Sequence, residues 1–320
     1  MSKFPLLQPD GTPLPGDGLV RVSRESLIRL KRQGGSLPLR AIRVRSRTTG
    51  AYLSRLRGRG MEFDEARPYQ AGDEIRHIDW RITARTGQPY SKLFREERER
   101  VVTLWVDYRA PMYFATQGCF KSVLASQAAA MIAWSAHKLG DRLSGLFFSE
   151  QGHRELRPGK GDRTALSLIG LLADYSQQAS PASLPEQRCD AARNALIRVN
   201  RVTRPGSLIF LISDFRDLDT QSETHLTSLA RHNDLVLLRV FDPLEAELPL
   251  AGKYSLSDGG RFVAIDSTDR ARRQAHREQY QARRKHLEQI CRRHGIHLFQ
   301  CATDDDLPAI LKSGLGRQAR

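Results

Sequence analysis

The chain has 320 residues, of which 40% are hydrophobic and 27% charged, so it can bury one large α/β core or two smaller ones, and its formal net charge is +15. It contains no apolar run of about 18 residues and no basic-then-apolar amino terminus, so we expect a cytoplasmic protein without a transmembrane segment. Its four cysteines, at positions 119, 189, 291 and 301, are widely spaced, which argues against a zinc site and a disulfide framework.

The first hundred residues predict a short helix followed by strands. Residues 1–18 are rich in Pro and Gly and are interpreted as a flexible lead. Ser23 is a good N-cap for the helical pattern SRESLIRLKRQG, which ends at Gly34. The segments LPLRAIRVR and QPYSKLFREE alternate in the manner of short strands. Residues 19–100 are therefore predicted to form a helix plus a β-rich extension.

Residues 101–320 predict a second domain, in which apolar strands alternate with helices. The strand segments VVTLWVD, RLSGLFFS, SLIFLISD, DLVLLRVFD and IHLFQCAT are separated by helical patterns, which favours an α/β fold with a doubly wound, mainly parallel sheet. HRELRP follows a short turn and is predicted to add one antiparallel edge strand. An Asp-Gly-Gly turn signal predicts a hairpin insertion near residues 253–268, before a long final helix.

The segment of residues 58–97 has an unusual density of Arg, Asp, Glu, Trp and Tyr. It resembles the defining segment of the bacterial domain-of-unknown-function family 58, and the resemblance covers residues 40–300, roughly. The later segments are similar to a von Willebrand factor A-type domain, which is the fold that the resemblance implies. The matching residues of the signature segment are Glu62, Phe63, Arg67, Tyr69, Gly72, Asp73, Arg76, Ile78, Asp79, Trp80, Ala84, Arg85 and Tyr90.

The signature segment admits a structural and a functional interpretation. Gly72 and Asp73 suit a tight turn, while Trp80 and Ile78 can anchor the segment in apolar surface. Alternating carboxylates and arginines can neutralise one another, which favours a structural network. The alternative is a docking surface, because arginines and aromatics supply most hot-spot energy at interfaces. The candidate docking residues are Glu62, Phe63, Arg67, Tyr69, Gly72, Asp73, Arg76, Asp79, Trp80 and Arg85.

Two predicted strands end in aspartates, Asp107 and Asp214, and the carboxyl edge of a doubly wound sheet is where ligands bind. In metal-binding A-type domains, a D-x-S-x-S loop, a Thr and a second Asp coordinate magnesium there, a set of hard oxygen ligands. The resemblance makes Thr164 the counterpart of that Thr. The two hydroxyl positions, however, hold Arg109 and Pro111 in this chain.

A positive charge at position 109 opposes metal binding, since two like charges 4 Å apart repel by about 4 kcal/mol at an effective dielectric of about 20. We therefore predict a degenerate site that holds no metal. The hypothesis is that Arg109 forks onto Asp107 or Asp214 and replaces the cation. The alternative is that Asp107 only caps the first helix and the loop is inert.

No G-x-S-x-G, H-E-x-x-H or G-x-x-x-x-G-K-[ST] motif is present, so neither an enzyme nor a cofactor is predicted. The family resemblance implies association with AAA+ ATPases of the MoxR class and a role in assembling or activating client proteins. The leading prediction is thus a non-enzymatic cytoplasmic adaptor. The alternative from another class is a metal-dependent hydrolase that uses the acidic cluster near Asp73 and Asp79.

A third alternative is a binder of anionic surfaces. Residues 40–59 contain seven arginines and no acidic residue, and residues 270–293 repeat the excess. Nucleic acid and the inner membrane surface are the usual partners of such stretches. Tyr52 and Tyr280 are the only aromatics in the two stretches, which argues against direct nucleic-acid binding by base stacking.

Overall fold

The computed structural model describes residues 17–39, 61–70, 73–96, 100–177, 184–249, 252–257 and 262–316. The chain divides into two compact units, one formed by residues 1–46 with 100–320 and the other by residues 47–99. Several predicted features lie outside the described residues: most of the flexible lead, all but the first three residues of the strand predicted from LPLRAIRVR, the basic stretch 40–59, and Gly72.

The larger unit is built on a six-stranded sheet in the order β10-β7-β6-β3-β4-β5. Five strands run parallel, and β5 pairs antiparallel with β4 at the edge. The predicted α/β fold with a doubly wound, mainly parallel sheet is confirmed. The strands are β3 (Val101–Asp107), β4 (Arg142–Ser149), β5 (Gly152–Gly159), β6 (Leu208–Ser213), β7 (Asp234–Phe241) and β10 (His297–Ala302).

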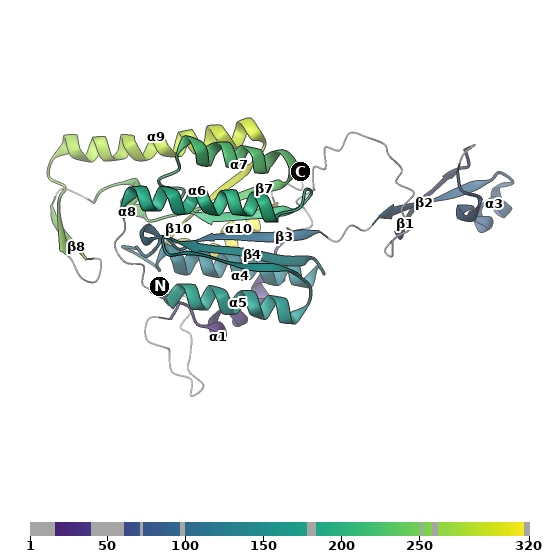
Figure 1. Cartoon of the computed structure of the whole chain (residues 1–320), viewed down its shortest axis with the longest axis horizontal. Helices are drawn as coiled ribbons and strands as arrows, with labels where there is room; N and C mark the ends of the chain where they lie inside the picture. The colour runs from purple at the N-terminus through teal and green to yellow at the C-terminus, as the bar shows by residue number, and fades with distance from the viewer. Residues whose placement is uncertain are drawn as a thin grey trace. The chain divides into compact units, whose positions relative to one another are not determined.

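Helices cover both faces of this sheet (Figure 1). The strand side chains alternate between two cores, so that Leu104 and Phe210 pack toward α4 while Trp105 and Leu211 pack toward α6 and α7. One face carries α4 (Lys121–Lys138), α5 (Asp162–Gln177) and α10 (Leu307–Gly316), and the other carries α6 (Pro185–Val202), α7 (Thr220–His232) and α9 (Arg270–His294). Short helices η3 (Ala110–Met112) and α8 (Pro243–Ala246) follow β3 and β7.

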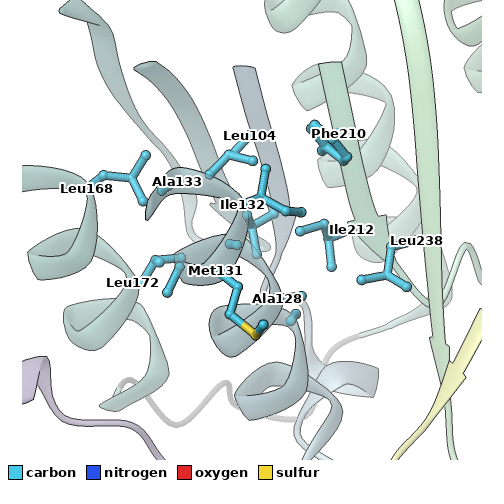
Figure 2. Packing of buried hydrophobic residues seen from close by; sticks show 14 of the residues in the cluster. Leu104, Ala128, Met131, Ile132, Ala133, Leu168, Leu172, Phe210, Ile212 and Leu238 are labelled. Carbon is cyan, nitrogen blue, oxygen red and sulfur yellow. The ribbon is translucent and has the colours of Figure 1, made fainter. Parts of the chain in front are cut away.

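Helix α4 is the centre of the larger core, because fifteen of its residues are buried. Figure 2 shows Ala128, Met131 and Ile132 of this helix among leucines of α5 and strand side chains such as Ile212. The many alanines of α4 let its backbone approach these neighbours closely, and each large apolar side chain buried here stabilises the fold by about 1.5–3 kcal/mol.

Two amino-terminal helices, α1 (Arg24–Arg29) and α2 (Lys31–Gly34), also pack on α4. Ser23 caps α1 through a capping box with Ser26. A Cβ on Gly34 would lie 2.5 Å from the carbonyl oxygen of Met131, so only glycine permits this close packing. The structure thus assigns these helices to the larger unit, whereas the sequence interpretation placed them with residues 19–100, because their contacts are far away along the chain.

The smaller unit contains β1 (Met61–Pro68) and β2 (Tyr90–Glu96), which pair antiparallel with a bulge after Phe63. Between them lie η2 (Ile75–His77) and α3 (Trp80–Thr86). Asp79 caps α3 by accepting from two backbone amides. In the larger unit, β8 (Lys253–Ser257) and β9 (Phe262–Asp266) form an antiparallel hairpin between α8 and α9. Among the described helices, none combines the length and apolarity that crossing a bilayer requires.

Candidate functional site

The carboxyl ends of β3 and β6 meet where the strand order reverses, and the side chains of Asp107 and Arg109 join there. Arg109 is only 1% exposed. Its Nη2 lies 2.6 Å from Oδ2 of Asp107, and its Nε lies 3.0 Å from both carboxylate oxygens. The hydroxyl of Ser213 donates to the same Oδ2 at 2.6 Å. The structure therefore contains the Arg109–Asp107 fork, and Arg109 also lies 3.8 Å from Asp214.

Arg109 also binds two backbone carbonyls. Nη1 donates to the carbonyl of Arg188 at 3.1 Å, and Nη2 donates to that of Arg216 at 3.2 Å. Burial alone would lower the pKa of Arg109, but the Asp107 carboxylate holds this pKa above its ordinary value. Arg109 is thus a permanent cation that ties the end of β3 to the loop after β6 and to the start of α6.

Lys121 supplies a second internal cation that sequence reasoning missed. It is the first residue of α4, and its side chain is fully buried. Its Nζ lies 2.9 Å from Oδ2 of Asp214 and 2.6 Å from Oε1 of Glu245. Burial would raise the pKa of Asp214, but the charges of Lys121 and then Arg109 hold it well below its usual range. The sequence did contain a signal for this buried cation, namely a lysine at the start of an otherwise apolar helix.

The other two predicted members of the degenerate site do not join it. Pro111 lies in η3, whose residues start the turn after β3. Thr164 lies near the amino ends of the parallel strands, away from Asp107. Its Oγ1 lies 3.3 Å from the carbonyl of Lys160, and its side chain packs on Gly159. Gly159 pairs with Leu143, near the beginning of β4, because antiparallel β5 returns the chain to the amino edge. Thr164 therefore cannot complete a site with Asp107.

The carboxylates of the signature segment have structural partners. Asp73 accepts from Arg67 at 2.7 Å and from the backbone amide of Gln70 at 3.0 Å. Asp79 caps α3 and lies 3.8 Å from Lys92. Within the described ranges, no three His, Cys, Asp or Glu side chains are grouped so that they could hold a metal ion.

Trp80 differs from the predicted burial of this segment, whereas Ile78, the other predicted anchor, is partly buried. Trp80 is 67% exposed and Ile75 is 69% exposed, so Trp80 does not anchor the segment in apolar surface. Arg76 and Arg85 are exposed on the same short helices, whereas Tyr69 is partly buried and its amide donates to the carbonyl of Pro89. Glu62 and Phe63 lie on β1, paired with Arg95 and Phe94 of β2.

Comparison with known proteins gives a family but no activity. The profile of the family described as "Protein of unknown function DUF58" matches residues 65–286. Uncharacterized proteins of Mycobacterium bovis and Mycobacterium tuberculosis are 30% identical over 258 residues, which are 80% of this chain and 79% of theirs.

Solved structures with similar folds include the conserved hypothetical protein BatB from Bacteroides thetaiotaomicron, at 14% identity and a TM-score of 0.42, covering 69% of this chain and 98% of that one. A von Willebrand factor type A protein from Catenulispora acidiphila is 12% identical with a TM-score of 0.40, covering 72% and 43%.

Proposed function

We propose that this chain, which belongs to the family described as protein of unknown function DUF58, is a non-enzymatic cytoplasmic adaptor for an AAA+ ATPase of the MoxR class. In this proposal the signature segment docks on one protein, and the carboxyl edge of the large sheet faces another, a client. The ATPase supplies the energy for assembling or activating that client. The association with this class of ATPase comes from the family resemblance.

The observation that carries the adaptor role is the exposure of Trp80 and Ile75 in the signature segment. Exposing the apolar surface of a tryptophan to water is unfavourable. Burying that surface in an interface stabilises the complex by about 3 kcal/mol, at about 25 cal/mol per Å² of apolar surface. Arg76, Arg81 and Arg85 are exposed on the same two short helices. Tryptophan and arginine are the residue types that dominate binding energy at protein interfaces.

The bonds of the acidic residues weigh against the hydrolase alternative. Asp73 is held by Arg67 and by a backbone amide, and Asp79 is held by the first turn of α3. A carboxylate that recruits a catalytic metal would have to give up these bonds. At the sheet edge, Asp107 and Asp214 are paired with Arg109 and Lys121 in the same way.

The third alternative, binding to an anionic surface, rests on residues 40–59, which lie outside the described residues. Binding of that kind depends on phosphate contacts and weakens steeply as salt is added. A titration of the purified protein with DNA or anionic vesicles at low and physiological salt separates it from the adaptor role.

Capture from the native host tests the adaptor proposal. Tagged wild-type protein is compared with Trp80→Ala and with Leu184→Ala, a matched control because Leu184 is 63% exposed in the larger unit. We expect a MoxR-class ATPase to be retained by wild type and by Leu184→Ala and to be lost from Trp80→Ala. Equal retention by all three proteins would contradict docking through the signature segment. Metal-dependent hydrolysis that disappears in Asp73→Asn would instead favour the hydrolase.

A further inference from the structure

Helix α3 of the smaller unit turns one defined face to solvent. The amide of Asp79, its N-cap, donates to the carbonyl of Tyr90 at 2.8 Å, and the amide of Tyr90 donates to Oγ1 of Thr83 at 3.0 Å. These two bonds hold the start of the helix against the start of β2, and Ile82 and Thr83 are partly buried on that side. The remaining positions of the helix are exposed in a fixed orientation.

The exposed face of α3 combines an apolar row with a basic row. Trp80 and Ala84 are four residues apart, as are Arg81 and Arg85, so the Cβ atoms within each row lie about 5–6 Å apart. Arg81 and Ala84 are three residues apart, which places the two rows side by side. All four residues are exposed. The surface thus offers an indole beside two guanidiniums.

The carboxylates next to α3 do not neutralise its arginines. Among the described residues, no carboxylate forms an ion pair with Arg76, Arg81 or Arg85. A neutral histidine adds no charge, so Glu74 still counts against these three arginines, and three positive charges minus one leave a net charge of +2 on η2 and α3. The pairs that the nearby carboxylates form are Asp73 with Arg67 at 2.7 Å, Asp79 with Lys92 at 3.8 Å, and Glu74 with His77 at 3.7 Å.

The acidic residues of the β1–β2 hairpin lie toward its other end. Tyr90 pairs with Pro68 at the end next to α3, and the strand carboxylates lie three to six positions further along β2. At about 3.3 Å per residue this is about 10–20 Å, beyond the screening length of about 8 Å at physiological salt, so they act weakly on Arg81 and Arg85. These strand residues are Glu62, Asp64, Glu65 and Glu96, while Glu97 and Glu99 lie outside the described residues.

We propose that the face formed by Trp80, Ala84, Arg81 and Arg85 binds an acidic segment of the partner protein, in which carboxylates flank an apolar side chain. The inference rests on the proposed adaptor function and adds the chemistry of the docking partner to it. Guanidiniums form directional paired hydrogen bonds with carboxylates, and an indole gains most when an apolar group covers it. A segment without carboxylates would leave the two arginine charges desolvated and unpaired in the interface, which is costly.

Acrylamide quenching of Trp80 tests this partner chemistry with the purified full chain. Trp105 and Trp134 are buried, so the quenchable emission reports on Trp80. The probes are a random copolymer of glutamate and tyrosine, polyglutamate, duplex DNA, and vesicles of phosphatidylglycerol and phosphatidylcholine in equal parts. We expect the copolymer to shield Trp80 at a lower concentration than any other probe, because it alone places carboxylates beside apolar side chains.

Two double variants assign the binding to α3. Arg81→Gln/Arg85→Gln should weaken the shielding by the copolymer about fivefold, the effect of losing two exposed ion pairs. Arg270→Gln/Arg277→Gln is the matched control and should bind as wild type does, because it removes the same charge from exposed positions of α9 in the larger unit. No shielding by the copolymer, or an equal effect of the two double variants, would overturn the proposal. So would polyglutamate, DNA or vesicles that shield Trp80 as well as the copolymer does.

Capture of the ATPase separates this inference from the adaptor role. If the copolymer shields Trp80 as expected but wild type captures no ATPase, the adaptor role fails and the acidic class of ligand stands. If Trp80→Ala loses a captured ATPase but the copolymer leaves Trp80 open to acrylamide, the adaptor role stands and the acidic class is wrong.

Discussion

The ammonium of Lys121, at the first position of α4, lies 2.9 Å from the carboxylate of Asp214, at the end of β6. The same nitrogen lies 2.6 Å from Glu245 of α8, and all three side chains are largely excluded from solvent. A helix start, a strand end and a short helix after the next strand are thus joined by one buried charge cluster. Its cation, Lys121, is supplied by the chain itself.

Replacing Lys121 tests how much this cluster contributes to stability. Lys121→Met keeps most of the side-chain volume but leaves Asp214 and Glu245 without their cation. Breaking one side of a buried pair costs about 3–5 kcal/mol, so we expect a clear fall in the free energy of unfolding, measured by urea denaturation. Lys138→Met, at the exposed end of the same helix, should cost less than about 1 kcal/mol. Equal costs would show that the buried cluster contributes no more than a surface lysine.

Magnesium is expected not to stabilise the wild-type protein. An added divalent ion at the sheet edge would meet Arg109 and Lys121, whose side chains occupy the space around Asp107 and Asp214. Thermal unfolding should therefore occur at the same temperature with excess Mg²⁺ as with chelator. A magnesium-dependent rise that is absent from Asp107→Asn would contradict the internal-cation interpretation.

Acid should lower the free energy of unfolding by protonating Asp214. Its pKa is depressed in the folded state, so its stabilising contribution is complete above the unfolded value, about 3.9, and is lost as pH falls toward the folded pKa. We expect the free energy of unfolding of wild type to fall below about pH 4 more steeply than that of Asp214→Asn. Asp174→Asn, at a partly exposed pair with Arg24, is the control and should follow wild type. Parallel curves for all three proteins would be inconsistent with this role.

The sequence was sufficient to predict the sheet and the meeting of Asp107 with Asp214. Each apolar strand is short and bounded by turn signals, and the switch point of a doubly wound sheet brings the two strand ends together. Arg109 is two residues from Asp107, so its fork could be predicted from local geometry. The sheet, the positions of the two strand-end aspartates and the Arg109 fork thus follow from local sequence patterns and general fold topology.

Contacts between distant segments could not be predicted in the same way. Lys121 and Glu245 are 124 positions apart, and nothing in either local pattern indicates the other. Thr164 was misplaced for a different reason. The predicted hairpin arm already implied that the chain returns to the amino ends of the parallel strands before α5 begins. The family resemblance had placed Thr164 at the carboxyl ends, and the antiparallel pairing of β5 rules that out. Trp80 was expected to be anchored, but its small unit has too few residues to cover it.

Gly118 is expected to be intolerant of any side chain. Its φ is +71°, and a Cβ there would lie 1.9 Å from the carbonyl oxygen of Thr303, which belongs to backbone after β10. Gly118→Ala should therefore cost more than the roughly 1–2 kcal/mol of left-handed strain alone. Gly206→Ala is the matched control, because Gly206 has φ +84° with no atom within 4 Å of its Cβ position. Urea denaturation of both variants separates the clash from the strain, and equal losses would exclude the close contact.

Tryptophan fluorescence can measure the exposure on which the proposed docking depends. Trp80 is 67% exposed, whereas Trp105 and Trp134 are buried in the larger unit. We expect acrylamide to quench one class of emission strongly and the rest weakly, and Trp80→Phe to remove the quenchable class. The measurement uses the isolated protein, so it does not require a partner.

The same signal then reports on binding. If the signature segment docks on an ATPase, the partner should shield Trp80 from acrylamide and shift its emission to shorter wavelength, because the indole leaves water. Leu184→Ala is expected to retain this response, since it leaves the signature segment unchanged. Quenching that is already weak in the free protein would mean that Trp80 is covered by the chain itself, and the docking surface would then have to lie elsewhere.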